Sequence, residues 1–210
     1  MVAAQFVTFE GIEGCGKSTQ LRLLERELRS RGHRVVVTRE PGGTPLGAKL
    51  RRLLLDPAVA AEPLAELLML IADRAHHVAT VIRPALAAGE WVLSDRFADS
   101  STAYQGVARG LGRQLVDSLN RIACECTWPA RTVVIDVPIP VALARARRRR
   151  STTAHNRRFE DLADAFHVAV ADAYRSIATA EPTRVRLVDG DGTVAEVHQR
   201  VVAAVADLLA

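Results

Sequence analysis

The residues from Gly11 to Thr19 read GIEGCGKST and match the phosphate-binding pattern G-x-x-x-x-G-K-[ST]. Glycines in such a loop let backbone N–H groups converge on phosphate oxygens, and the helix that follows presents its positive end to them. A lysine at position 17 reaches the β- and γ-phosphates, and a serine hydroxyl at position 18 ligates Mg²⁺. The pattern therefore predicts a triphosphate site formed by Gly11, Ile12, Glu13, Gly14, Cys15, Gly16, Lys17, Ser18 and Thr19.

A second group of charged residues ends the apolar run WVLSDR, from Trp91 to Arg96. If this run is a strand, Asp95 lies at its carboxyl end and holds Mg²⁺ through water, opposite Ser18. Arg96 would then point into the same crevice, where a guanidinium binds phosphate oxygens in bidentate fashion. The residues alone leave open a surface ion pair between Asp95 and Arg96.

The segment from Ala144 to Arg158 holds seven arginines and no acidic residue, so its charge exceeds the formal net charge of +4 of the whole chain. It could bind a nucleic-acid backbone, a membrane surface or the phosphates of a small molecule. A nucleic-acid-binding protein usually spreads basic residues over a whole face, and no aromatic residue interleaves here. This concentration of charge favours a local role.

These residues need elements that position them, and the chain alternates short apolar runs with longer helical patterns. Strands are predicted at Gln5–Glu10, Arg34–Arg39, Trp91–Asp95, Thr132–Asp136 and Val185–Asp189. Helices are predicted at Lys17–Arg31, Leu46–Leu55, Pro63–Ala88 with a kink at Pro84, Ser100–Gln105, Gln114–Cys126, Glu160–Ala180 and Val194–Leu209, and from about Pro140 into the arginines. Such alternation predicts one α/β domain over residues 1–210, with a five-stranded parallel sheet covered by helices on both faces. Ligands of such sheets lie at the carboxyl ends of the strands.

Composition agrees with a globular protein, since 49% of the residues are hydrophobic and 25% are charged. Cys15, Cys124 and Cys126 have neither a disulfide framework nor metal-ligand spacing, which favours reduced thiols. No signal peptide and no uncharged apolar run of membrane-spanning length is visible. We expect a cytoplasmic protein without a membrane partner.

The stretch DRFADSSTAYQG, from Asp95 to Gly106, resembles the thymidylate kinase signature DRY-x-DS-x-x-AYQG. TREPGGTPLG, ADRAHHV and RRFE also occur in the order of that family, so the resemblance covers essentially the whole chain. It implies a P-loop NTPase fold of the nucleoside monophosphate kinase type, with a short arginine-rich lid at about residues 146–159. It also implies transfer of the γ-phosphate of ATP to dTMP with Mg²⁺, giving dTDP and ADP in dTTP biosynthesis. A homodimer is implied, with dTMP and ATP as the small-molecule partners and no nucleic acid.

The resemblance assigns roles to individual residues. Arg96 would bridge the acceptor phosphate and the transferred group, and Glu13 would lie near the deoxyribose 3′-hydroxyl. Arg39 would help to hold the phosphate of dTMP, and Arg74 would hydrogen-bond to the thymine edge. The base pocket would be lined by Ser100, Ser101 and Gln105. Tyr104 would pack against the sugar, where it disfavours a 2′-hydroxyl. The variable positions of the phosphate-binding loop hold no basic residue, so the lid would supply the remaining catalytic arginines. Arg149 and Arg158 are favoured, beside Lys17 and Arg96.

The chain departs from the family pattern at the thymine pocket. Leu70 stands one helical turn before Arg74, where relatives usually carry a phenylalanine that stacks on thymine, so weaker dTMP binding is predicted. Arg157 replaces an acidic residue in the lid ending, and His76 and His77 are interpreted as ordinary helix positions. Two alternatives remain open. The first is a kinase for another acceptor, either dUMP or a nucleoside, and a nucleoside would need Glu13 or Asp95 as its general base. The second is a nucleotide-binding regulator with a basic nucleic-acid-binding arm.

Overall fold

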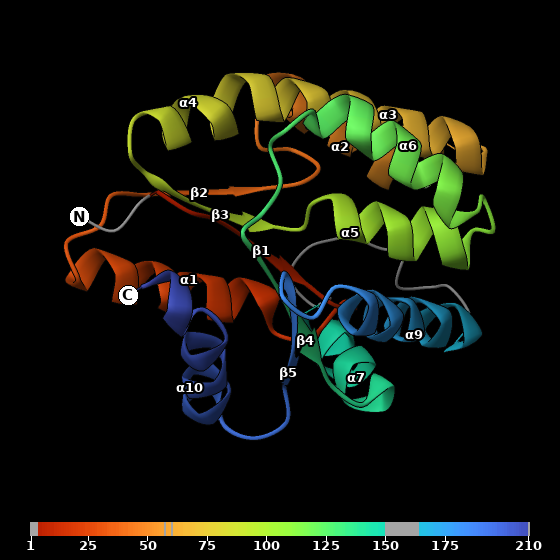
Figure 1. The fold of residues 1–210 in the computed structure, drawn as a ribbon. Helices are drawn as coiled ribbons and strands as arrows, with labels where there is room; N and C mark the ends of the chain where they lie inside the picture. Colours follow the sequence, from red (N-terminus) through yellow and green to blue (C-terminus); the bar gives the residue numbers. More distant parts are fainter. Residues whose placement is uncertain (1–3, 57, 60, 150–163, 210) are drawn as a thin grey trace.

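A five-stranded parallel sheet forms the centre of the molecule, which is a computed structural model describing residues 4–56, 58–59, 61–149 and 164–209 (Figure 1). The strands lie in the order β2-β3-β1-β4-β5, and every neighbouring pair is parallel. Their bounds are β1 Phe6–Glu10, β2 Val35–Arg39, β3 Trp91–Asp95, β4 Arg131–Asp136 and β5 Val185–Asp189. The predicted α/β class and all five strands are confirmed.

One face of the sheet is covered by α1 (Lys17–Ser30) and α10 (Val194–Ala204), which pack against each other (Figure 1). Leu21, Leu24 and Leu28 form the predicted apolar face of α1 and are buried. Their spacing of three and four residues puts them on one side of the helix, where they join the main core. Burial of this stripe fixes the start of α1, and therefore the end of the phosphate-binding loop, against the sheet.

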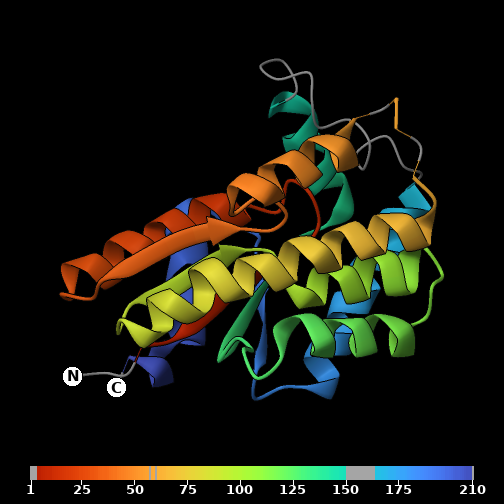
Figure 2. The same cartoon turned by 90° about the horizontal axis from the view of Figure 1, so that it is seen from above.

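The other face carries α2 (Pro45–Leu55), α3 (Pro63–His77) and α6 (Arg113–Cys124). From α3 the chain continues through a π-helical turn, η1 (Val78–Ile82), into α4 (Arg83–Ala87), and the three segments make one long rod across the sheet (Figure 2). The long helix predicted at this place exists, but its irregularity precedes Pro84 as a π turn. Because proline has no N–H, the preceding turn lacks its regular hydrogen bond and adopts wider geometry.

Beyond the carboxyl edge of the sheet, α5 (Ala98–Ser101) and the π-helical η2 (Thr102–Ala108) lie beside α9 (Asp164–Ala180). This packing brings residues that follow β3 against a helix from near the end of the chain. The helix expected from Pro140 is α7 (Ile139–Arg149), and it does run into the arginines. In the part of the chain that the structure describes, no helix is long and apolar enough to cross a membrane.

Candidate active site

The loop between β1 and α1 is held in a shape that glycine favours. Gly14 has a φ of +83°, and a Cβ placed there would lie 2.0 Å from the carbonyl oxygen of Ala142 in α7. The loop therefore touches the helix that leads to the arginine segment. Nζ of Lys17 donates to the carbonyl oxygens of Gly11 and Ile12 at 3.0 and 2.9 Å, which holds the ammonium over the loop.

Ser18 and Asp95 meet at the mouth of this loop, as predicted. Oγ of Ser18 donates to Oδ2 of Asp95 at 2.6 Å, although the two residues lie 77 positions apart. A hydroxyl and a carboxylate are oxygen ligands of the kind that Mg²⁺ prefers, so the pair fits that ion. Over the described ranges, no group of three or more His, Cys, Asp or Glu side chains is placed to hold a metal. Phosphate oxygens and water would therefore complete the coordination of Mg²⁺.

Arg96 lies in a strained, largely buried position next to Asp95. Its φ of +75° is in the left-handed region, which is uncommon for a non-glycine residue and recurs at functional sites. Its Nη2 atom lies 3.4 Å from Oε2 of Glu13 and 3.1 Å from the hydroxyl of Tyr104. The sequence left open a surface ion pair between Asp95 and Arg96, and this interpretation is wrong. Asp95 accepts a hydrogen bond from Ser18, and Arg96 pairs with Glu13.

Two pockets meet at Arg96. The first, called the P-loop pocket here, is polar and is lined by Glu13, Gly14, Gly16, Lys17, Ser18, Arg39, Glu40, Arg51, Asp95 and Arg96. The second, called the apolar pocket, is lined by Glu13, Glu40, Pro41, Arg51, Leu54, Leu55, Leu70, Arg74, Arg96, Phe97, Ser100, Ser101, Tyr104 and Gln105. The shared residues are Glu13, Glu40, Arg51 and Arg96. A polar pocket and a pocket with apolar walls thus lie side by side and share four lining residues.

Every residue that the sequence assigned to the acceptor lies at one of these pockets. Arg39 is exposed and lines the P-loop pocket, whereas the others line the apolar pocket. Several polar groups already have protein partners, since Gln105 donates to Glu66 at 2.8 Å. Leu70 is partly buried and contributes an apolar wall without an aromatic ring.

The guanidinium of Arg74 is saturated by the protein. It donates five hydrogen bonds from its three nitrogens, to Glu40, Asn120, the carbonyl of Phe97 and, twice, Ser101. A guanidinium has five N–H hydrogens, so one of these bonds has to open before Arg74 can donate to a ligand. Its role toward thymine stays a prediction, whereas its role in joining α3 to the segment after β3 is direct.

His77 lies in a helix as interpreted, at the end of α3, but it is not a solvent-exposed position. It is fully buried, its Nδ1 lies 2.8 Å from Oε1 of Glu40, and its Nε2 lies 2.7 Å from Oγ1 of Thr38. Glu40 thus sits between His77 and Arg74, and it lines both pockets. One feature of the sequence pointed to this role: Glu40 is an acidic residue directly after the second strand.

Arg51 on α2 is a further residue that sequence reasoning missed. It lines both pockets, and its Nη1 donates to the carbonyl of Pro41 at 3.0 Å. Burial and the nearby charges of Arg39 and Arg96 lower its pKa, and all three guanidinium groups belong to residues that line the P-loop pocket. Such a cluster favours an anionic ligand.

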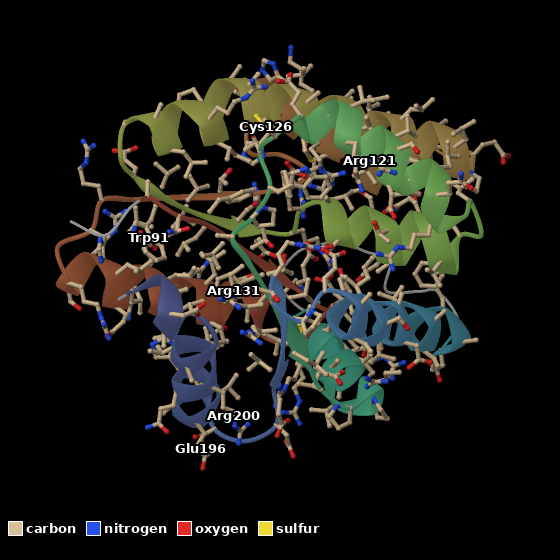
Figure 3. All side chains as sticks on the ribbon, in the orientation of Figure 1. Trp91, Arg121, Cys126, Arg131, Glu196 and Arg200 are labelled. Atoms are coloured by element: carbon tan, nitrogen blue, oxygen red, sulfur yellow. The ribbon has the colours of Figure 1, made fainter. Side chains whose placement is uncertain are left out.

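The structure describes only the beginning of the predicted lid. Arg158 and most of residues 146–159 lie outside the described residues, and only the backbone of Arg149 is placed, at the end of α7. Charged side chains of α10, such as Glu196 and Arg200, lie across the sheet from α3 and α6 (Figure 3). They take no part in either pocket.

Comparison with known proteins agrees with this geometry. The thymidylate kinase family model matches residues 9–201. A thymidylate kinase of Trichlorobacter lovleyi is 47% identical over 98% of both chains, and one of Pelobacter propionicus is 50% identical over 95% of this chain and 93% of the relative. The structure of a thymidylate kinase from Ehrlichia chaffeensis superposes with a TM-score of 0.79 at 34% identity, covering 97% of this chain and 99% of that one. The chain belongs to the thymidylate kinase family.

Proposed function

We propose that this chain transfers the γ-phosphate of ATP to dTMP, giving dTDP and ADP. One observation carries the proposal: the polar P-loop pocket and the apolar pocket share a wall that includes Arg96. A donor in the first pocket and a nucleoside monophosphate in the second would meet phosphate to phosphate. Phosphoryl transfer needs this in-line placement and neutralised charge more than covalent help from the protein.

On the donor side, the loop from Gly11 to Thr19 holds the triphosphate through its backbone N–H groups and Lys17. Lys17 would exchange its carbonyl partners for the β- and γ-phosphates. Ser18 and Asp95 would hold Mg²⁺, which neutralises phosphate charge when it is bound. Arg96, placed between the pockets, would stabilise the transferred group, with Arg149 and Arg158 approaching from the lid.

On the acceptor side, Arg51 lines both pockets and Arg39 lines the P-loop pocket, so both would supply positive charge where the phosphate of dTMP meets the donor. The apolar walls bind the base, and Leu70 gives contact without ring stacking. Tyr104 is fixed by its hydrogen bond to Arg96, which holds its ring against the position of the sugar. A rigid ring there disfavours the extra hydroxyl of a ribonucleotide.

A homodimer formed through α2, α3 and α6 is part of the proposal. These helices carry large apolar side chains that are more than two fifths exposed: Leu46, Leu53, Leu64, Leu68, Leu115 and Ile122, the last at 72%. Apolar side chains concentrated on neighbouring helices mark an association surface. Replacing Leu68 by glutamate should yield a monomer in sedimentation analysis, and an unchanged sedimentation coefficient would count against this surface.

The reaction is tested by measuring kcat/KM with ATP and Mg²⁺ for dTMP, dUMP, ribothymidine monophosphate, dCMP, dGMP, AMP and thymidine. We expect clear preference for dTMP and no turnover of thymidine, which brings no phosphate to Arg39 and Arg51. Preference for thymidine would support a nucleoside kinase. ATP binding without turnover of any acceptor, together with salt-sensitive DNA or RNA binding, would support the regulator alternative.

A further inference from the structure

Arg96 is held by two buried residues that line neither pocket. Glu10 is the last residue of β1 and is 0% exposed, and Tyr174 lies on α9 and is 1% exposed. Neither belongs to the residues lining the P-loop pocket or the apolar pocket. Both nevertheless connect to the guanidinium of Arg96, directly or through Ser100.

The contacts form a compact group of oxygen atoms. The hydroxyls of Ser100 and Tyr174 donate to Oε2 of Glu10 at 2.6 and 2.7 Å, and their own oxygens lie 2.9 Å apart. The backbone N–H of Phe97 donates to Oε1 of Glu10 at 2.7 Å. Nη1 of Arg96 approaches the same two hydroxyl oxygens, at 3.0 Å for Ser100 and 3.4 Å for Tyr174. The two hydroxyls thus bridge a carboxylate and a guanidinium.

The count of hydrogens favours an ionised Glu10. Each hydroxyl has one hydrogen, and both can point to the carboxylate, which leaves the lone pairs of Ser100 and Tyr174 free to accept from Arg96. A protonated Glu10 would have to donate its own hydrogen to one of these oxygens. The hydroxyl that accepts this hydrogen would have to turn its own hydrogen to the other hydroxyl, 2.9 Å away, and Arg96 would compete for the remaining lone pairs.

We propose that Glu10 and Tyr174 are positioning residues that fix the guanidinium of Arg96 for phosphoryl transfer, and that this hold requires Glu10 to be ionised. The inference rests on the proposed role of Arg96. It explains why a buried carboxylate and a tyrosine from a distant helix converge behind a residue with strained backbone. A displacement of about 1 Å at a reacting group costs on the order of a hundredfold in rate.

The titration of Glu10 gives this hold a pH dependence. Burial raises the pKa of Glu10 to about 7, although the charge of Arg96 and the hydrogen bonds of Ser100 and Tyr174 lower it. Among the described residues, the ionisable groups that act on Glu10 include Arg96, Asp99, Arg74 and Tyr174, from four different segments. As the pH falls through 7, Glu10 takes up a proton and kcat should fall with it.

The test is kcat against pH for Tyr174→Phe, which keeps the buried ring and removes one hydroxyl. Loss of that hydrogen bond raises the pKa of Glu10 further, so the acidic limb of the kcat profile should move to higher pH. We expect kcat at pH 7 to fall by about tenfold, with KM for ATP unchanged. In Glu10→Gln, which cannot ionise, the acidic limb should disappear and kcat should stay low at every pH.

Thr8→Val is the matched control, because Thr8 lies two residues before Glu10 on β1. It is fully buried, and its hydroxyl lies 2.9 Å from that of Thr132 instead of touching Arg96. This variant should lose stability yet keep the wild-type kcat profile. The inference is overturned if Tyr174→Phe keeps the wild-type profile, or if Thr8→Val shifts the profile equally. Absence of dTMP turnover in the wild type would instead overturn the proposed function.

Discussion

Arg74 should be the main anchor of the apolar pocket, and Arg74→Met measures this directly. The Arg74 and Glu40 side chains are 2% and 3% exposed, and Nε of Arg74 lies 2.9 Å from Oε2 of Glu40. Removing one partner of a buried ion pair costs about 3–5 kcal/mol, because the other charge stays buried. Methionine fills much of the space of the arginine stem, so this loss reflects the charge and its hydrogen bonds.

A double-mutant cycle with Glu40→Gln separates the ion pair from the remaining contacts. Because the double variant has no buried carboxylate left at Glu40, it should recover at least about 1 kcal/mol of the loss in Arg74→Met. The assay is unfolding by guanidinium chloride, followed by circular dichroism at equal protein concentrations, since association affects apparent stability. An Arg74→Met variant within about 0.5 kcal/mol of the wild type, or strictly additive effects, would refute the anchor.

Three further predictions follow from single positions. Leu70→Phe should lower KM for dTMP by about two- to tenfold through ring stacking worth about 0.5–1.5 kcal/mol, and steady-state kinetics with an unchanged KM would contradict this. Gly14→Ala should destabilise the fold by about 1–3 kcal/mol more than Gly32→Ala, as measured by denaturant unfolding. Both glycines have positive φ, but of the two only Gly14 faces a backbone oxygen, that of Ala142. Burial raises the pKa of Asp73 from 3.8 to about 6, so its folded form binds the extra proton, and stability should fall as the pH rises between these values. Asp73→Asn should therefore gain stability relative to the wild type across that interval in pH-dependent unfolding, and a constant difference would exclude the effect.

The fold and the donor half of the site follow from local sequence patterns. The loop at Gly11–Thr19 combines a fixed spacing with a preceding strand and a following helix, so its structure depends on few distant residues. The meeting of Ser18 and Asp95 was predictable because parallel strands bring their carboxyl ends to one edge.

The remaining parts depend on packing between distant segments. Tyr174 reaches Glu10 only because α9 packs beside η2, and no periodicity in the sequence encodes that contact. The same holds for His77, which packs against the loop that begins at Glu40, directly after β2. The hydrogen bonds that saturate Arg74 could not be predicted from the sequence either, since one of them requires Asn120 on α6 to face α3.

The central claim is that Arg96 acts where the two pockets meet, and Arg96→Met tests it most directly. The measurement is kcat for dTMP phosphorylation, together with binding of ATP and dTMP by calorimetry, with Arg96→Lys as the charge-preserving control. The account predicts that kcat falls by at least about a hundredfold in Arg96→Met, while ATP binding changes by less than about threefold. A folded Arg96→Met enzyme with kcat near that of the wild type would contradict it.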